Sequence, residues 1–279
     1  MGTVVSFHAH PDDESIPSGG TLAAAHAEGH RTVLVVATRG ELGEVAPDVL
    51  VPGETLAERR TGELMEAARV LGIDRVEFLG YLDSGMAGSE SNDAPGSFWS
   101  ADPDEAADRL AVILDEERPD VLTVYDEHGG YGHPDHIQVH RVGHLAARRS
   151  GVPRVLEVTM NRDHIRSLIE VRAAEAAAEV GSEVPIEGAG PELDAIEVDL
   201  DGDDPFGSPE AIITHAVDVT PWLDLKRAAM RAHASQIPED SWFLQLSDEE
   251  FAAAFGTEWF IDPDAPRAEG GPFVESIWR

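Results

Sequence analysis

The amino-acid sequence predicts an α/β protein with a Rossmann-like, doubly wound and mostly parallel sheet. Short apolar runs rich in β-branched residues alternate with longer amphipathic segments over the first 180 residues, which is the pattern of consecutive βαβ units. Polar and charged residues follow two of these apolar runs directly, as they do where parallel strands end at a ligand-binding edge.

The predicted elements follow in order along the chain. Strands are expected at 3–8, 32–38, 75–79, 120–125 and 154–160, and helices at 19–28, 55–71, 104–117, 134–149 and 163–180. Residues 85–100 are rich in Gly, Ser and Asn and are expected to form a loop beside the site. The later part is expected to contain strands at 195–199, 214–219 and 257–261 and helices at 222–234 and 248–254, in an order that the pattern does not define.

Two short polar segments carry the candidate chemistry. His10-Pro11-Asp12-Asp13-Glu14 follows the first predicted strand, and His133-Pro134-Asp135-His136 follows the fourth after the glycine turn Gly129-Gly130. Because the carboxyl ends of parallel strands lie at one edge of a sheet, the two segments are expected to form one site.

The residue types in these segments indicate a metal-dependent hydrolase. His10, Asp13 and His136 match the three protein ligands that hold a catalytic zinc or ferrous ion and leave positions open. Asp12 then remains free as a general base toward water activated by the metal. The alternative is that Asp12 and Asp13 only cap the following helix. His140 and His144 continue the helical spacing from His136, but the helix carries them away from the ligand cluster.

The same segments carry a family resemblance. Residues 7–15, FHAHPDDES, and 125–136, YDEHGGYGHPDH, resemble the PIG-L/LmbE-type metal-dependent N-deacetylases. Within that family they are most similar to the mycothiol-pathway deacetylases of N-acetylglucosaminyl-inositol and to the mycothiol-conjugate amidases. A third segment, LDSGMAG at 82–88, is more similar to the deacetylases. Residues 15–19, SIPSG, lack the lysine that the amidases have shortly after the first motif, which disfavours that activity.

The resemblance implies a role for each matching residue. It makes His10, Asp13 and His136 the metal ligands and Asp12 the base. It also makes His133 a general acid or oxyanion stabiliser whose imidazole Asp135 holds. A carboxylate beside an imidazole favours its cationic form, which donates to developing negative charge.

The resemblance implies three further roles at the substrate. Tyr131 is implied as a mobile donor to the oxyanion, and Arg60 and Asp83 as contacts to sugar hydroxyls. Arg60 could instead be a solvated helix residue, as is expected for its neighbour Arg59.

The resulting prediction is a zinc-dependent N-deacetylase with one divalent metal, ferrous iron being the alternative, that acts on an N-acetylglucosamine-containing small molecule. Two other activities stay open: amidase cleavage of mycothiol-type S-conjugates, and sugar binding by a metal-retaining protein without turnover. Residues 1–165 are expected to form the metal-binding catalytic domain. Residues 166–279 are expected to form a smaller acidic α+β subdomain at the rim of the active site.

Composition restricts the partners and the location. The 279-residue chain has a formal net charge of -34 and no cysteine. The charge disfavours nucleic acid and anionic membranes as partners, because phosphates attract Lys and Arg. We expect a cytoplasmic protein for three reasons. The chain cannot form disulfides, it leaves no room for a signal peptide before Thr3, and it contains no apolar run long enough to span a membrane. A homo-oligomer stays open.

The segment between Arg172 and Lys226 is acidic and contains no basic residue. It is most simply a solvated insert. A calcium site at 199–204, DLDGDD, is the alternative, although the segment lacks the full twelve-residue loop of the EF-hand.

Overall fold

A seven-stranded sheet forms the centre of the protein, in a computed structural model that describes residues 1–45, 49–180 and 206–279. The strands lie in the order β3-β2-β1-β4-β5-β7-β6. Their bounds are β1 (Thr3–His8), β2 (Arg31–Val36), β3 (Arg75–Phe78), β4 (Val121–Tyr125), β5 (Val155–Thr159), β6 (His215–Asp218) and β7 (Thr257–Ile261). The first five strands are parallel, and β7 and β6 add antiparallel pairs beyond β5. The predicted fold class is therefore confirmed.

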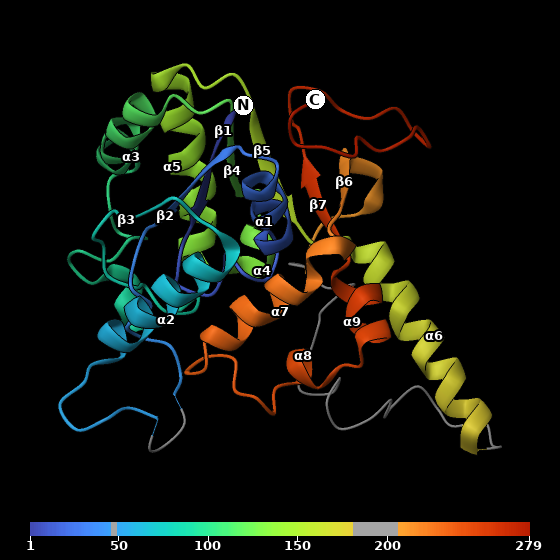
Figure 1. Ribbon diagram of the computed structural model, residues 1–279. Coiled ribbons are helices and arrows are strands. Elements are labelled where there is room, and N and C mark those ends of the chain that lie inside the picture. Colours follow the sequence, from blue (N-terminus) through green and yellow to red (C-terminus); the bar gives the residue numbers. More distant parts are fainter. Residues whose placement is uncertain (46–48, 181–205) are drawn as a thin grey trace.

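Helices cover both faces of the sheet (Figure 1). The α-helices are α1 (Gly19–Ala27), α2 (Leu56–Leu71), α3 (Pro103–Glu117), α4 (Gly129–Gly132), α5 (Pro134–Ser150), α6 (Arg162–Val180), α7 (Leu223–Ala232), α8 (Trp242–Gln245) and α9 (Asp248–Phe255). Helices α3 and α5 pack together on one face, and α1, α2 and α7 pack together on the other. None of the helices in the described ranges is long and apolar enough to cross a lipid bilayer.

Alternating side chains of the central strands explain these two layers. Phe7 and Val124 lie close to Gly143 of α5, where an added Cβ would come within 2.3 Å of Val124. Leu34 and Val36, which point to the opposite face of the sheet, form a buried cluster with Leu64 of α2. Both faces of the parallel strands are thus buried, as their nearly continuous apolar sequences require.

Capping residues define where the site-bearing helices begin. Thr55 and Glu58 form a capping box at the start of α2. His133 caps α5 by accepting a hydrogen bond from the backbone N–H of Asp135, and Pro134 occupies the first helical position. The second metal-binding candidate segment is therefore rigidly tied to a helix N-terminus.

The predicted element bounds agree with the structure to within two residues wherever residues are described. Helix α8 and the 3-10 helix Glu90–Asp93, inside the loop expected at 85–100, were not predicted. The strand expected at 195–199 and the calcium alternative at 199–204 lie outside the described residues. Strands β6 and β7 extend the main sheet, and the division of the chain at residue 165 stays a prediction.

A buried ion pair joins the C-terminal part to the first helix. Lys226, the only lysine of the chain, places Nζ 2.7 Å from Oε1 of Glu258, and both side chains are 1% exposed. The Glu258 carboxylate also accepts the backbone N–H groups of Gly20 and Thr21 in the first turn of α1. The carboxylate thus receives both a cation and the positive end of a helix.

Replacing Lys226 by Met is expected to lower the free energy of unfolding by about 3 kcal/mol, because it leaves Glu258 buried without its cation. Chemical denaturation followed by circular dichroism measures this change. Arg69→Met, which breaks the solvent-exposed pair of Arg69 with Glu66, should produce no measurable change. An unaltered denaturation midpoint for Lys226→Met would show that the pair does not stabilise the fold.

Candidate active site

The two polar segments meet at the carboxyl ends of β1 and β4, which are neighbours in the sheet. The first segment lies between β1 and α1, and the second lies between β4 and α5. In the order of strands, β4 follows β1 although they are more than 100 residues apart in sequence. The two segments therefore lie together at one edge of the sheet, as expected.

Asp13 lies between the imidazoles of His10 and His136. Its Oδ2 is 3.4 Å from Nδ1 of His10, and its Oδ1 is 3.4 Å from Nε2 of His136. Burial opposes ionisation of Asp13, but the neighbouring imidazoles of His136 and His10 outweigh the burial and lower the pKa of Asp13 well below the usual range. One anionic carboxylate between two imidazole nitrogens is a donor set that suits a divalent transition metal.

The orientation of His136 fits this assignment. Its Nδ1 lies 3.1 Å from the carbonyl oxygen of Gly129, so the tautomer that donates to this oxygen has its lone pair on Nε2. That Nε2 is buried without a hydrogen-bond partner in the described part of the chain. Gly129 has φ 65°, and a Cβ there would lie 2.6 Å from Cβ of His136, so this close approach requires glycine. The ring also stacks on Tyr125 at 4.2 Å.

Two further carboxylates face His10 on its other side. Oδ2 of Asp135 is 3.1 Å from Nε2 of His10, and Oδ1 of Asp83 is 3.6 Å from the same atom. Hydrogen bonds from the backbone N–H and the hydroxyl of Ser84 hold Asp135 in place. When Nε2 of His10 donates its N–H to the Asp135 carboxylate, the lone pair of the ring is on Nδ1, the nitrogen that faces Asp13. Asp135, expected on the imidazole of His133, thus contacts His10 and Ser84 with its carboxylate.

Asp83 is buried rather than exposed at the rim. It accepts the backbone N–H groups of Leu42 and Gly85. Burial opposes its ionisation, but its hydrogen bond to His10 and the charge of that ring outweigh the burial and lower the pKa of Asp83. Donor atoms of His10, Asp83 and Asp135 lie within 4.8 Å of one another, as do those of His10, His133 and His136. Imidazoles and carboxylates are therefore concentrated around His10.

Asp12 has the properties of a strained and perturbed carboxylate. Its φ is 108°, a conformation that costs a non-glycine residue free energy and that is found mostly at functional sites. Burial raises its pKa to about 6, against the charge of Arg60, which lowers it. A base whose pKa is close to neutral takes up and releases a proton readily at physiological pH.

Arg60 reaches this loop from helix α2. Its guanidinium donates to the carbonyl oxygens of Pro11 and Gly40 and to Oδ1 of Asp12, the last at 3.1 Å. Gly40 has φ 65°, and a Cβ there would lie 2.2 Å from Nη1 of Arg60, so the approach depends on glycine. Arg60 is therefore a buried contact of Asp12, and Arg59 instead pairs with Glu54 at 2.8 Å.

His133 is neutral in this environment. Burial, followed by the neighbouring His10 and His136, lowers its pKa to about 4. Its Nδ1 accepts the backbone N–H of Asp135 at 3.1 Å. The neutral ring therefore carries its proton on Nε2 and remains a hydrogen-bond donor there. The cationic form expected from the sequence is not the favoured one.

Tyr131 lies in the turn that precedes α5. Its backbone departs from helical geometry between Gly130 and Gly132, which both have positive φ, and its side chain is 44% exposed. The ring contacts His136 edge-on at 5.0 Å and lies 6.2 Å from the ring of His133. A glycine-flanked, half-exposed phenol beside the histidines suits a group that moves when a ligand binds.

A buried pair behind Asp12 was not indicated by the sequence. Oε2 of Glu14 accepts the backbone N–H of Asp12, and Oε1 lies 2.7 Å from Nε2 of His233. Burial alone would lower the pKa of His233, but the charge and hydrogen bond of Glu14 raise it. The available signal was a third acid directly after Asp12 and Asp13. The Glu14–His233 pair thus holds the strained backbone of Asp12 in place.

Three comparisons with known proteins show what the chain is similar to. The family model of PIG-L, GlcNAc-PI de-N-acetylase, matches residues 5–147. The 1D-myo-inositol 2-acetamido-2-deoxy-alpha-D-glucopyranoside deacetylase of Acidothermus cellulolyticus is 41% identical over an alignment of 268 residues that covers 93% of this chain and 88% of that protein. The protein of the same description from Streptomyces griseus is 43% identical over an alignment of 257 residues that covers 87% of this chain and 77% of that protein.

A solved structure extends the similarity to three dimensions. The N,N'-diacetylchitobiose deacetylase of Pyrococcus horikoshii superposes with a TM-score of 0.54 at 26% sequence identity and covers 93% of this chain and 82% of that one. The similarity therefore includes the C-terminal part of the chain as well as the region that the family model matches.

Proposed function

Since the chain belongs to the PIG-L family of GlcNAc-PI de-N-acetylases, we propose that it hydrolyses the acetamide of an N-acetylglucosaminyl-inositol and releases acetate and the free amine. The observation that carries this proposal is the position of Asp13 between His10 and His136, with Asp12 held beside them. A cytoplasmic location and a homo-oligomer stay predictions.

We propose that Nδ1 of His10, the carboxylate of Asp13 and Nε2 of His136 hold one zinc ion, with ferrous iron as the alternative. The buried Nε2 of His136, which has no hydrogen-bond partner among the described residues, supports this set. A bound divalent ion supplies Lewis-acid chemistry, since it lowers the pKa of water and polarises an amide carbonyl. Asp135 would orient His10 from the other side of the ring.

Asp12 is proposed as the general base. Its carboxylate would take a proton from the attacking water as the C–O bond forms at the amide carbon. Arg60 and the backbone contact of Glu14 hold this residue in place without water between them. The pKa of Asp12, about 6, leaves the carboxylate mostly ionised at neutral pH.

His133 and Tyr131 are proposed to stabilise the negative charge on the former carbonyl oxygen. The neutral imidazole of His133 would donate from Nε2, because its Nδ1 is occupied by the backbone N–H of Asp135. The hydroxyl of Tyr131 would add a second donor after a rotation of its side chain. The proton on Asp12 then passes to the leaving nitrogen as the C–N bond breaks.

Acetate release from N-acetylglucosaminyl-inositol tests the proposal. Protein stripped of metal with a chelator should be inactive, and it should regain turnover with added zinc or ferrous ion. A mycothiol S-conjugate supplied in parallel distinguishes an amidase. Tight binding of the amino sugar by metal-loaded protein without acetate release would indicate a sugar-binding protein instead.

Arg60 is proposed to contact the sugar, as Asp83 is, and also to tune Asp12. Replacing Arg60 by Ala should lower kcat/KM by about 10-fold to 1000-fold, from the loss of a charge-assisted hydrogen bond and of orientation. Activity rises as pH rises through the pKa of Asp12, because the base must be ionised. Arg60 lowers that pKa, so its removal should move the acid limb of the kcat/KM profile to higher pH.

A pH profile of kcat/KM for the wild type and the variant measures this shift. Arg59→Ala, which removes the neighbouring arginine of α2, is the matched control and should leave the profile in place. A loss of kcat/KM with an unmoved acid limb would restrict Arg60 to sugar binding.

A further inference from the structure

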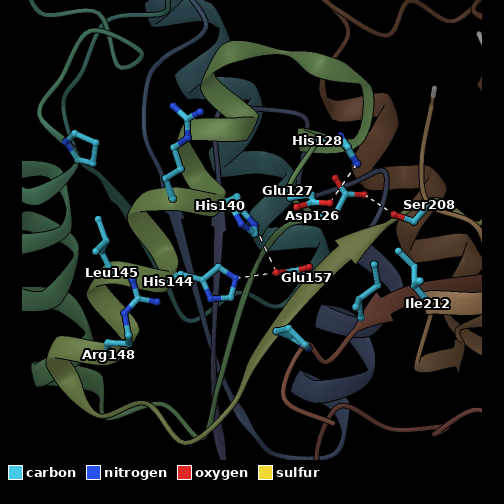
Figure 2. A pocket seen from close by; sticks show the side chains of 14 residues that line it. Asp126, Glu127, His128, His140, His144, Leu145, Arg148, Glu157, Ser208 and Ile212 are labelled. Atoms are coloured by element: carbon cyan, nitrogen blue, oxygen red, sulfur yellow. Dashed lines mark hydrogen bonds and ion pairs between the residues drawn. The ribbon is translucent and has the colours of Figure 1, made fainter. Parts of the chain in front are cut away.

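A second group of metal-ligating side chains lies on the α5 side of the sheet. It faces a cavity of about 640 Å³ that the proposed metal ligands do not line. Figure 2 shows His140 and His144 pointing from α5 across to Glu157 of β5. Because α5 rises about 6 Å every four residues, these histidines lie one and two turns beyond His136.

The three side chains converge closely. Nε2 of His144 is 2.8 Å from Oε1 of Glu157, and Nδ1 of His140 is 3.5 Å from the same oxygen. One donor atom of each residue lies within 4.8 Å of the other two. Ligand atoms about 2.0 to 2.1 Å from a tetrahedral ion are about 3.4 Å apart, so small side-chain rotations would produce this geometry.

Glu157 lacks a permanent cation in the described part of the chain. It is 8% exposed and lies on a strand that is otherwise mostly apolar, and among the described residues it forms ion pairs with the two imidazoles alone. A buried carboxylate is costly without a compensating charge.

The groups around these side chains orient them in the way that neighbouring groups orient metal ligands. Nδ1 of His140 lies 3.0 Å from the carbonyl oxygen of Tyr125, so the tautomer that donates to this oxygen has its lone pair on Nε2, which would be the ligand atom. The rings of His140 and His144 contact each other at 4.6 Å. Arg141 also lines the cavity, but its guanidinium lies over the ring of Trp99. The cavity leaves room for water to fill the remaining coordination positions.

We propose that His140, His144 and Glu157 bind a second divalent transition-metal ion of the zinc class, which would clamp α5 to β5. Two imidazoles and one carboxylate are the donors that such ions prefer. The ion would supply the positive charge that Glu157 lacks.

Metal counting on the full chain tests the proposal. Chelator-treated protein is loaded with zinc, separated from free metal and analysed by mass spectrometry. The wild type should hold two ions per chain, and His144→Ala and Glu157→Gln should each hold one. His164→Ala, which removes a histidine whose Nε2 lies 2.9 Å from the carbonyl oxygen of Ala253, should still hold two.

A His136→Ala background separates this site from the proposed active site. In that protein one cobalt(II) ion should still bind and give a visible d–d spectrum, which adding His144→Ala should abolish. Circular dichroism checks that each variant is folded. A crystal of the zinc-loaded wild type should give an anomalous peak between His140, His144 and Glu157.

One ion per chain in the wild type, or a count that His144→Ala and Glu157→Gln leave unchanged in folded protein, would overturn the proposal. If the wild type holds a single ion that only His136→Ala removes, the result would support the active-site ligands. His140, His144 and Glu157 would then share a proton instead of binding a metal ion. Failure of the second site is thus distinguishable from failure of the proposed function.

Discussion

Asp12→Asn is expected to lower kcat by a factor on the order of 100 or more while the protein keeps its fold and its metal content. The amide keeps the shape of the carboxylate and an oxygen that accepts from Arg60. Asn also tolerates positive φ better than most residues, so the strained backbone at 108° should persist. What the substitution removes is the ability to take a proton from water.

Single-turnover acetate release and metal analysis on the same preparation check this result. Asp102→Asn is a matched control, because Asn replaces Asp equally well as the N-terminal cap of α3. Near-normal turnover in Asp12→Asn would assign the base to another residue, and Glu14, whose carboxylate accepts the backbone N–H of Asp12, would be tested next.

The candidate metal ligands could be predicted because their positions depend on local structure. His10 and Asp13 follow a strand directly, and His136 lies in the first turn of a helix that His133 and Pro134 begin. Parallel pairing of β1 with β4 then brings the two segments together. Strand ends, helix caps and sheet order are features that periodicity and motif spacing indicate.

The contacts of Arg60, Asp135 and Glu14 could not be predicted because they depend on tertiary packing. Arg60 reaches Asp12 only because the backbone turns at Gly40. Glu14 finds its partner His233 across 219 residues of sequence. Asp135 turns to His10 because Ser84 holds its carboxylate there. A motif gives the residue types present at a site, but it does not give the direction of each side chain.

The edge of the sheet illustrates the same limit. The runs at 214–219 and 257–261 were recognisable as strands, but nothing local indicated that β7 would pair with β5 and β6 with β7. The Glu258 carboxylate on β7 reaches the first turn of α1 and Lys226 of α7. These long-range contacts fix the C-terminal part against the first helix.

His136→Ala is expected to remove one metal ion per chain and to lower turnover by about 1000-fold or more. Losing one of three protein ligands leaves an incomplete site, and water then keeps a pKa near 15.7 instead of about 7. The substitution also ends the stacking on Tyr125, so His136→Gln serves as a second variant that retains more of the side-chain volume. His10→Ala and Asp13→Ala should have the same effect.

The measurement is zinc content together with acetate release, performed in a His144→Ala background so that only the proposed active-site ion is counted. His164→Ala in that background is the control and should retain one ion and full turnover. A folded His136→Ala protein that still binds zinc one to one with unchanged affinity would refute the ligand set, and it would leave His133, the third imidazole of the cluster, as the ligand to test next.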